Sequence, residues 1–175
     1  SYSQAIKTEV VSMGGEIIAR VLEVVVDPET GKIAGFLLVP KGKKIVSPSD
    51  IIFWDQHIII HDANDILDTS EILKAKEILS KNIPVIKNKV YTQDKIFLGS
   101  VLDFIINPKL FTLTKIIVAK TFLKIFPYDE KIISYQNIIE IKKSGIIVRS
   151  PSVAIKIEGK MRAKAKLQTD PAITI

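Results

Sequence analysis

The chain repeats itself after about 80 residues. Residues 20–28 and 100–108 share an apolar run that ends in an acidic or amide residue followed by proline. Residues 36–39 and 116–119 keep this spacing of 80, and residues 47–52 correspond to 134–139 at a spacing of 87. A repeat of this length is a whole small domain, because the units of solenoid proteins are shorter. The sequence therefore predicts two related domains in tandem.

Composition and turn signals favour sheet over helix. The chain contains 32 isoleucines against 12 leucines, and β-branched side chains suit strands. Residues 17–27 and 32–39 are predicted to form a hairpin, with Pro28 and Gly31 favouring the turn between them. Shorter strands are predicted at residues 45–46, 51–54 and 57–61. Short strands at even spacing are typical of a small β-barrel.

A helix is predicted between the two copies, over residues 70–81. Asp68 and Glu71 have the spacing of a capping box, and Asn82 and Pro84 mark the helix end. The predicted fold class is mainly β, with two small β-barrels in tandem joined by a short helix. The predicted organisation consists of a first barrel, a linker helix, a second barrel and a basic C-terminal segment, over residues 1–67, 68–82, 83–150 and 151–175.

Several protein classes are disfavoured by what the sequence lacks. There is no cysteine, which excludes disulfides, thiolate zinc sites and cysteine nucleophiles. The first residues have no apolar stretch of the kind found in signal peptides. No uncharged apolar run approaches the 18 or more residues of a membrane-spanning helix. We therefore expect a cytoplasmic protein.

The repeated pattern resembles the PRC-barrel family, which is named for the photosynthetic reaction centre. In the first copy the resemblance rests on residues 18–27, the turn ending at Gly31, and residues 36–39 and 46–51. In the second copy it rests on residues 98–107, 116–118 and 133–134. The resemblance covers about residues 12–150.

The two copies depart from the family pattern in different places. The usual Gly-x-Val entry to the hairpin is intact at Gly99, whereas the first copy has Ala19 at that point. The second copy has Phe111 opposite Gly31, and Tyr135 opposite Pro48.

The resemblance implies an adaptor role. Members of the family form the extramembrane domain of the reaction-centre H-subunit, which packs on other subunits, and the C-terminal domain of a ribosome-maturation factor, which contacts a ribosomal protein. Neither precedent is an enzyme, so the resemblance implies no catalytic residues, and no cofactor is expected here.

The two histidines are the main candidates for chemistry. His57 and His61 are four residues apart, with Asp55, Asp62 and Asp65 nearby in sequence. They either share a face of a strand as part of a metal site or are solvated residues at a strand end. Two histidines without a defined third ligand favour the second interpretation, so no metal is expected. Asp27 and Asp50 are expected to serve turns rather than acid–base chemistry.

The change of spacing from 80 to 87 places an insertion at residues 121–128 of the second copy. It is unusually apolar for a loop, beside Lys120 and Lys124. Its apolar side chains either cap a barrel or form a surface for a protein partner or a membrane. The candidate partner-binding residues are Phe122, Leu123, Phe126 and Tyr128.

The last 25 residues carry much of the positive charge, with five Lys or Arg against two acidic residues. Their alternating apolar residues predict either an added hairpin turning at Gly159 and Lys160 or a ragged basic tail. The candidate anion-binding residues are Lys156, Lys160, Arg162, Lys164 and Lys166.

The sequence leads to one functional expectation with two alternatives. We expect a non-enzymatic scaffold that binds a protein partner and takes no small-molecule substrate. The first alternative is an RNA- or ribosome-associated assembly factor acting through the basic segment. The second is peripheral membrane association through residues 121–128. Arginine is scarce before the basic segment, with only Arg20 and Arg149, which disfavours nucleic-acid readout by the barrels.

Overall fold

The computed structural model describes the backbone of residues 1–39, 43–122 and 126–150. Side chains are described over the same ranges, apart from those of residues 122 and 126–128.

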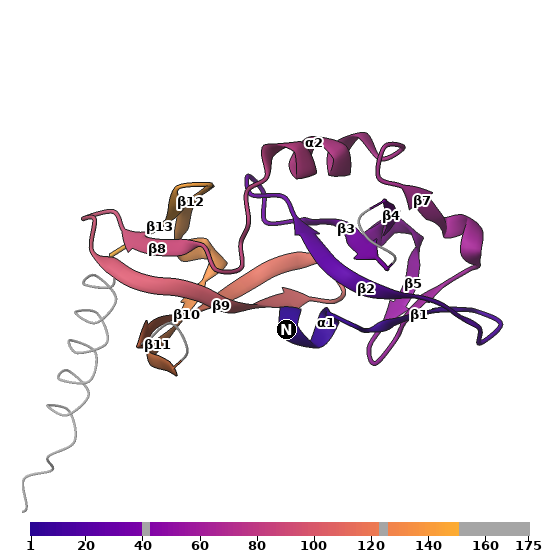
Figure 1. Cartoon of the computed structure of the whole chain (residues 1–175), viewed down its shortest axis with the longest axis horizontal. Coiled ribbons are helices and arrows are strands. Elements are labelled where there is room, and N and C mark those ends of the chain that lie inside the picture. Colours follow the sequence, from indigo (N-terminus) through magenta and orange to yellow (C-terminus); the bar gives the residue numbers. More distant parts are fainter. Residues whose placement is uncertain (40–42, 123–125, 151–175) are drawn as a thin grey trace, which may run out of the picture.

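The described chain is mainly β and forms two separate sheets, which lie side by side along the long axis of the molecule (Figure 1). The strands of the first sheet are β1 (Glu9–Ser12), β2 (Ile17–Val26), β3 (Ile33–Leu38), β4 (Lys44–Val46), β5 (Ile51–Trp54), β6 (Ile58–Ile60) and β7 (Ile66–Asp68). The strands of the second sheet are β8 (Lys89–Thr92), β9 (Phe97–Asn107), β10 (Thr112–Phe122), β11 (Phe126–Ser134), β12 (Ile138–Lys142) and β13 (Gly145–Val148).

The two sheets have the same topology, which confirms the predicted fold class. Strands are ordered β5-β6-β1-β2-β3-β4-β7 in the first sheet and β12-β13-β8-β9-β10-β11 in the second. The first six strands therefore correspond one to one, and among the described residues β7 extends the first sheet alone, at its β4 edge. Each sheet also pairs its first strand in parallel with its last barrel strand, β1 with β6 and β8 with β13.

The repeat extends to the backbone conformation. Lys7 and Lys87, 80 residues apart, both have positive φ, at 71° and 65°. Gly31 and Phe111 form a second such pair, at 69° and 48°. A residue other than glycine at positive φ costs roughly 1–2 kcal/mol, so Phe111 keeps a turn geometry that its own side chain disfavours.

Apolar side chains from both sheets merge into one continuous core. Phe36 and Leu38 of the first barrel and Phe104 and Ile116 of the second are fully buried members of the same cluster. Each such burial stabilises the fold by about 1.5–3 kcal/mol. Sharing a core stabilises two domains that are each near the lower size limit for independent folding.

The two hairpin turns join the barrels through a reciprocal contact. The Ile33 N–H donates to the Phe111 carbonyl at 2.8 Å, and the Leu113 N–H donates to the Gly31 carbonyl at 2.8 Å. Lys32 and Thr112 form a β-bridge between these bonds. Residues 31, 32 and 33 are the equivalents of 111, 112 and 113 at the spacing of 80, so the contact has an approximate two-fold axis, as in an isologous dimer.

Both departures of the second copy from the family pattern lie at this junction. The Phe111 ring stacks on Trp54 at 6.0 Å between centroids and meets Phe36 edge-on at 6.3 Å. The Tyr135 ring lies against Gly31, so closely that a Cβ there would be 2.5 Å from it. Phe111 and Tyr135 therefore occupy these positions as contacts between barrels.

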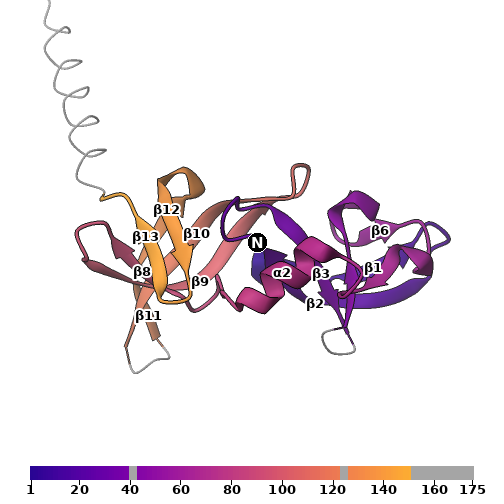
Figure 2. The ribbon, with the colours of Figure 1, turned by 90° about the horizontal axis from the view of Figure 1, so that it is seen from above.

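Two helices accompany the first barrel. The short α1 (Tyr2–Ala5) places the N-terminus at the junction in both views (Figures 1 and 2). The longer α2 (Leu73–Lys81) packs Ala75 and Ile78 onto the outer face of the first sheet. Three short 3-10 turns complete the described elements, at Pro48–Asp50, Ala63–Asp65 and Tyr135–Asn137.

The predicted start of the helix is wrong. The helix begins at Leu73, after Ile72, without a side-chain cap. Asp68 belongs to β7 and its carboxylate bonds Lys44 Nζ at 3.1 Å. The Glu71 carboxylate accepts a hydrogen bond from the Asp68 N–H at 2.7 Å. The two residues expected to cap the helix therefore close a turn that precedes it. The predicted end is confirmed, because Asn82 adopts the left-handed conformation that terminates α2.

The described residues of the insertion, 121–122 and 126–128, are strand rather than loop, which corrects the sequence expectation. Residues 121–122 and 126–128 belong to β10 and β11, with Phe122 opposite Phe126 in the ladder. The added residues therefore lengthen a hairpin, because strand pairing satisfies backbone groups that a loop would leave to water.

Candidate partner-binding surface

An outward-facing row of apolar side chains crosses four strands of the first barrel. The ladder places Phe53 of β5 opposite Ile59 of β6, Ile59 beside Val11 of β1, and Val11 opposite Ile17 of β2. Val10, Ile58 and Ile60, the strand neighbours of Val11 and Ile59, are buried, so Val11 and Ile59 point away from the core, and the ladder places Phe53 and Ile17 beside them. Phe53 is 58% exposed and Ile17 is 55% exposed, while Val11 and Ile59 are half-buried. We call this set the apolar row.

Charged side chains border the apolar row. Glu9 lies two residues before Val11, on the same face of β1. Its carboxylate pairs with Arg20 at 2.8 Å, and His57 Nδ1 lies 3.7 Å from its second oxygen. An apolar centre with a charged rim is the usual anatomy of a protein–protein contact.

The second barrel has a counterpart of the row. Glu140, Ile147, Tyr91 and Phe97 follow one another across β12, β13, β8 and β9. The Tyr91 and Phe97 rings are in contact, with centroids 5.4 Å apart. Glu140 stands where the first barrel has Phe53, so the second row is more polar at its edge.

The histidines singled out in the sequence lie on either side of β6. His57 faces Glu9, and the His61 N–H donates to an oxygen of Asp65 at 2.7 Å. In the described part of the chain, no group of three His, Asp or Glu side chains is placed to hold a metal ion.

The predicted turn role of Asp27 is confirmed. Its carboxylate accepts from the Glu29 N–H at 3.0 Å and the Thr30 hydroxyl at 2.9 Å, and it pairs with Lys74 at 3.3 Å. Burial alone would raise the pKa of Asp27, but these hydrogen bonds and Lys74 together lower it. Asp50 also serves a turn, since it ends the 3-10 turn after Ser47.

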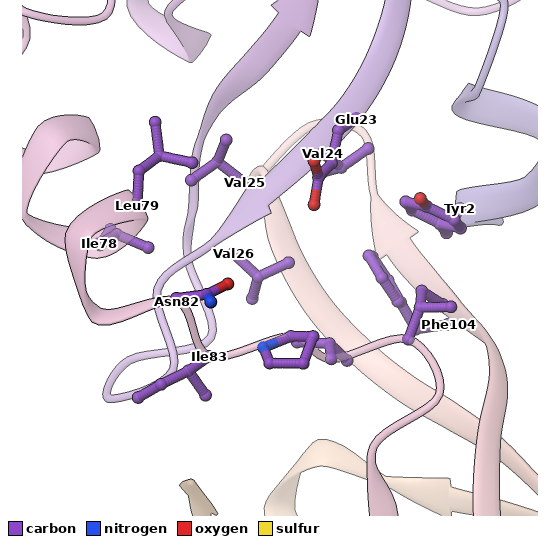
Figure 3. Close-up of a pocket in the computed structure, with 13 residues that line it drawn as sticks. Tyr2, Glu23, Val24, Val25, Val26, Ile78, Leu79, Asn82, Ile83 and Phe104 are labelled. Atoms are coloured by element: carbon purple, nitrogen blue, oxygen red, sulfur yellow. The ribbon is translucent and has the colours of Figure 1, made fainter. Parts of the chain in front are cut away.

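A cavity of about 240 Å³ lies between α2 and the two barrels (Figure 3). Its walls are mostly aliphatic, with Val25, Ile78 and Leu79 on one side and Tyr2 and Phe104 on the other. The Glu23 carboxylate is its charged group. Burial, followed by the charges of Glu23 and Asp103, raises the pKa of Tyr2.

Asp103 occupies in the second barrel the position of Glu23 in the first. It accepts hydrogen bonds from the Ser3 hydroxyl at 2.6 Å and the Ser3 N–H at 3.1 Å. Burial would raise the pKa of Asp103, but the bonds from Ser3 and Phe104 lower it. This carboxylate therefore anchors the N-terminal segment to the second barrel.

The other predicted site residues fall where side chains are not described. This holds for the candidate partner-binding residues at 122, 123, 126 and 128 and for the candidate anion-binding residues of segment 151–175. Both remain predictions. The apolar row was missed in the sequence because β1 was not predicted, and only the pairing of β1 with β6 aligns the row.

A family comparison agrees with this architecture. The family model of the PRC-barrel domain matches residues 1–69, which span α1 and all seven strands of the first sheet. The first domain is therefore a PRC-barrel domain, and the second sheet repeats its strand order. No curated protein matches the chain. Within the described residues, no helix has the length and apolar character needed to cross a bilayer.

Proposed function

We propose that this protein is a non-enzymatic scaffold that binds a protein partner through the apolar row of its first barrel. The observation that carries the proposal is the alignment of four apolar side chains on a rigid sheet face beside the Glu9–Arg20 ion pair. Exposed aromatic residues such as Phe53 supply much of the energy at protein interfaces. Two similar barrels allow two such contacts on one chain.

The charges on this surface favour a protein partner over the alternatives. A nucleic-acid site needs a basic surface, whereas Arg20 and Lys142 beside the two rows are each paired with a carboxylate, Glu9 and Glu140. The two carboxylates also disfavour membrane binding through the rows, because burying a carboxylate in lipid is costly. The expected cytoplasmic location and the absence of enzymatic activity remain predictions.

Affinity capture from source-cell lysate, with tagged full-length chain, tests the proposal. The test variant is Phe53→Asp, and the matched control is Leu73→Asp, which puts the same charge at an apolar side chain that is 80% exposed on α2. We expect a defined protein to be recovered with the wild type and with Leu73→Asp, and about tenfold less with Phe53→Asp, as losing about 1.4 kcal/mol implies. Circular dichroism checks that both variants are folded.

Two further arms separate the alternatives. Nuclease treatment before capture is expected to leave recovery unchanged. Loss of recovery after RNase treatment would support the RNA- or ribosome-associated reading instead. Sedimentation with vesicles containing anionic lipid is expected to leave the protein in the supernatant. Equal capture by Phe53→Asp and the wild type would contradict a role for the apolar row.

A further inference from the structure

The internal repeat continues beyond the second barrel. The ladders fix the spacing of the last barrel strands at 88, since Ile58 pairs with Val10 and Ile146 pairs with Val90. At the same spacing of 88, residues 73–80 of α2 correspond to residues 161–168. The shared or similar pairs are Leu73 and Met161, Lys74 and Arg162, Ala75 and Ala163, Lys76 and Lys164, and Leu79 and Leu167.

In the first copy, α2 covers the outer face of its own barrel. Ala75 and Ile78 pack against Val25, Leu37 and Ile45, which come from β2, β3 and β4. Ile45 is fully buried as a result. The helix is thus the last element of the first copy, and it covers an apolar face that would otherwise meet water.

The second barrel has the same face in the same register. Ile117 pairs with Ile132, as Leu37 pairs with Ile45. Ile105 occupies the position of Val25. Yet Ile132 is 69% exposed, whereas Ile45 is 0% exposed. Among the described residues, no element covers this face of the second barrel as α2 covers the face of the first barrel.

The β11 edge of the second sheet also differs from the β4 edge of the first sheet. In the first sheet β7 pairs with β4, with Leu67 opposite Ile45. Among the described residues β11 ends the second sheet at the corresponding edge. At a spacing of 88, β7 corresponds to residues 154–156, which precede residues 161–168 by the same four-residue gap that separates β7 from α2.

We propose that residues 154–168 dock on the outer face of the second barrel, over Ile105, Ile117 and Ile132, as β7 and α2 dock on the first. The contact is within one chain, because the segment begins four residues after the last described residue, as β7 begins soon after β6. This inference is independent of the proposed partner surface, because the apolar row lies on β5, β6, β1 and the first residue of β2, whereas α2 packs on the far end of β2 and on β3 and β4.

The substitutions between the copies predict a weaker contact than that of α2. Lys166 replaces the buried Ile78, which removes apolar contact. Asn107 and Lys109 replace Asp27 and Glu29, which pair with Lys74 and Lys81 in the first copy. The docked segment is therefore held by apolar burial without those ion pairs, and added salt is not expected to release it.

Two matched variants in the full-length chain test the proposal. Ala163→Glu puts a carboxylate at the position of Ala75, which is fully buried in the first copy. Ala165→Glu makes the same change two residues on, at the position of the exposed Glu77. Hydrogen exchange is followed at the amides of Lys131, Ile132 and Ile133, and methyl NMR reports contacts of Ile132.

We expect the Ile132 methyl groups to contact Ala163 or Leu167 in the wild type and in Ala165→Glu. In Ala163→Glu we expect this contact to disappear and the β11 amides to exchange about tenfold faster, while those of β4 are unchanged. Absence of the contact in the wild type, or equal behaviour of the two variants, would overturn the proposal. A contact that appears only between differently labelled chains in a mixed sample would also overturn it, by showing that a second copy covers the face.

Discussion

The junction between the barrels predicts an unusually large cost for the substitution Gly31→Ala. Gly31 has a φ of +69°, and a Cβ there would lie 2.5 Å from the Tyr135 ring. Gly15 provides a matched control, because its φ is +86° and a Cβ there would have nothing within 4 Å. The two substitutions share the backbone cost, so their difference measures the contact with Tyr135.

The expected magnitudes follow from these two terms. The left-handed conformation costs alanine about 1–2 kcal/mol, and restriction of the unfolded chain returns about 0.4–1 kcal/mol. Gly15→Ala should therefore lower the free energy of unfolding by about 1 kcal/mol. Displacing the half-buried Tyr135 ring adds an overpacking cost of about 1–3 kcal/mol, which gives Gly31→Ala a loss of about 2–4 kcal/mol.

Denaturant unfolding of the four single and double variants checks this reasoning. In a Tyr135→Ala background, Gly31→Ala should cost only about 1 kcal/mol, because the obstructing ring is gone. Thermal melts should show the same order, at about 2–4 °C per kcal/mol for a chain of this size. The reasoning fails if Gly31→Ala costs no more than Gly15→Ala, or if its cost is unchanged when Tyr135 is removed.

Three further predictions concern stability. Phe111→Ala should cost about 1.5–3 kcal/mol in chemical unfolding, about half the value for a fully buried ring, whereas Leu110→Ala beside it, which is exposed, should be nearly neutral. Asp27→Asn should cost roughly 1.5–3 kcal/mol at pH 7. The folded-state pKa of Asp27 is lowered, so the stability from its carboxylate is fully present above about pH 4 and is lost as pH falls through the folded-state pKa. The difference in unfolding free energy between wild type and Asp27→Asn should therefore close in unfolding titrations at low pH. Asn82→Ala should cost about 1 kcal/mol in thermal melts, since the helix end needs positive φ, while Asn82→Gly should be tolerated.

Local patterns in the sequence predict the elements whose signals are strong. The hairpin around Gly31, the end of α2 at Asn82 and the turn role of Asp27 follow from residues adjacent in sequence. The strands β1 and β7 were missed because each is short and gains its stability from pairing with a distant strand. The helix start was misplaced because Asp68 is taken up by β7, so tertiary pairing overrides a local capping signal.

The sequence alone determines that the chain is a tandem repeat of a mainly β unit, because hydrophobic period, turn residues and repeat spacing are local properties of the chain. Only the tertiary structure decides what the differences between the copies do. Phe111 and Tyr135 depart from the family pattern in sequence, yet in space they form the junction. The apolar row likewise joins residues from Val11 to Phe53 through strand register, which is fixed by pairing between segments far apart in the chain.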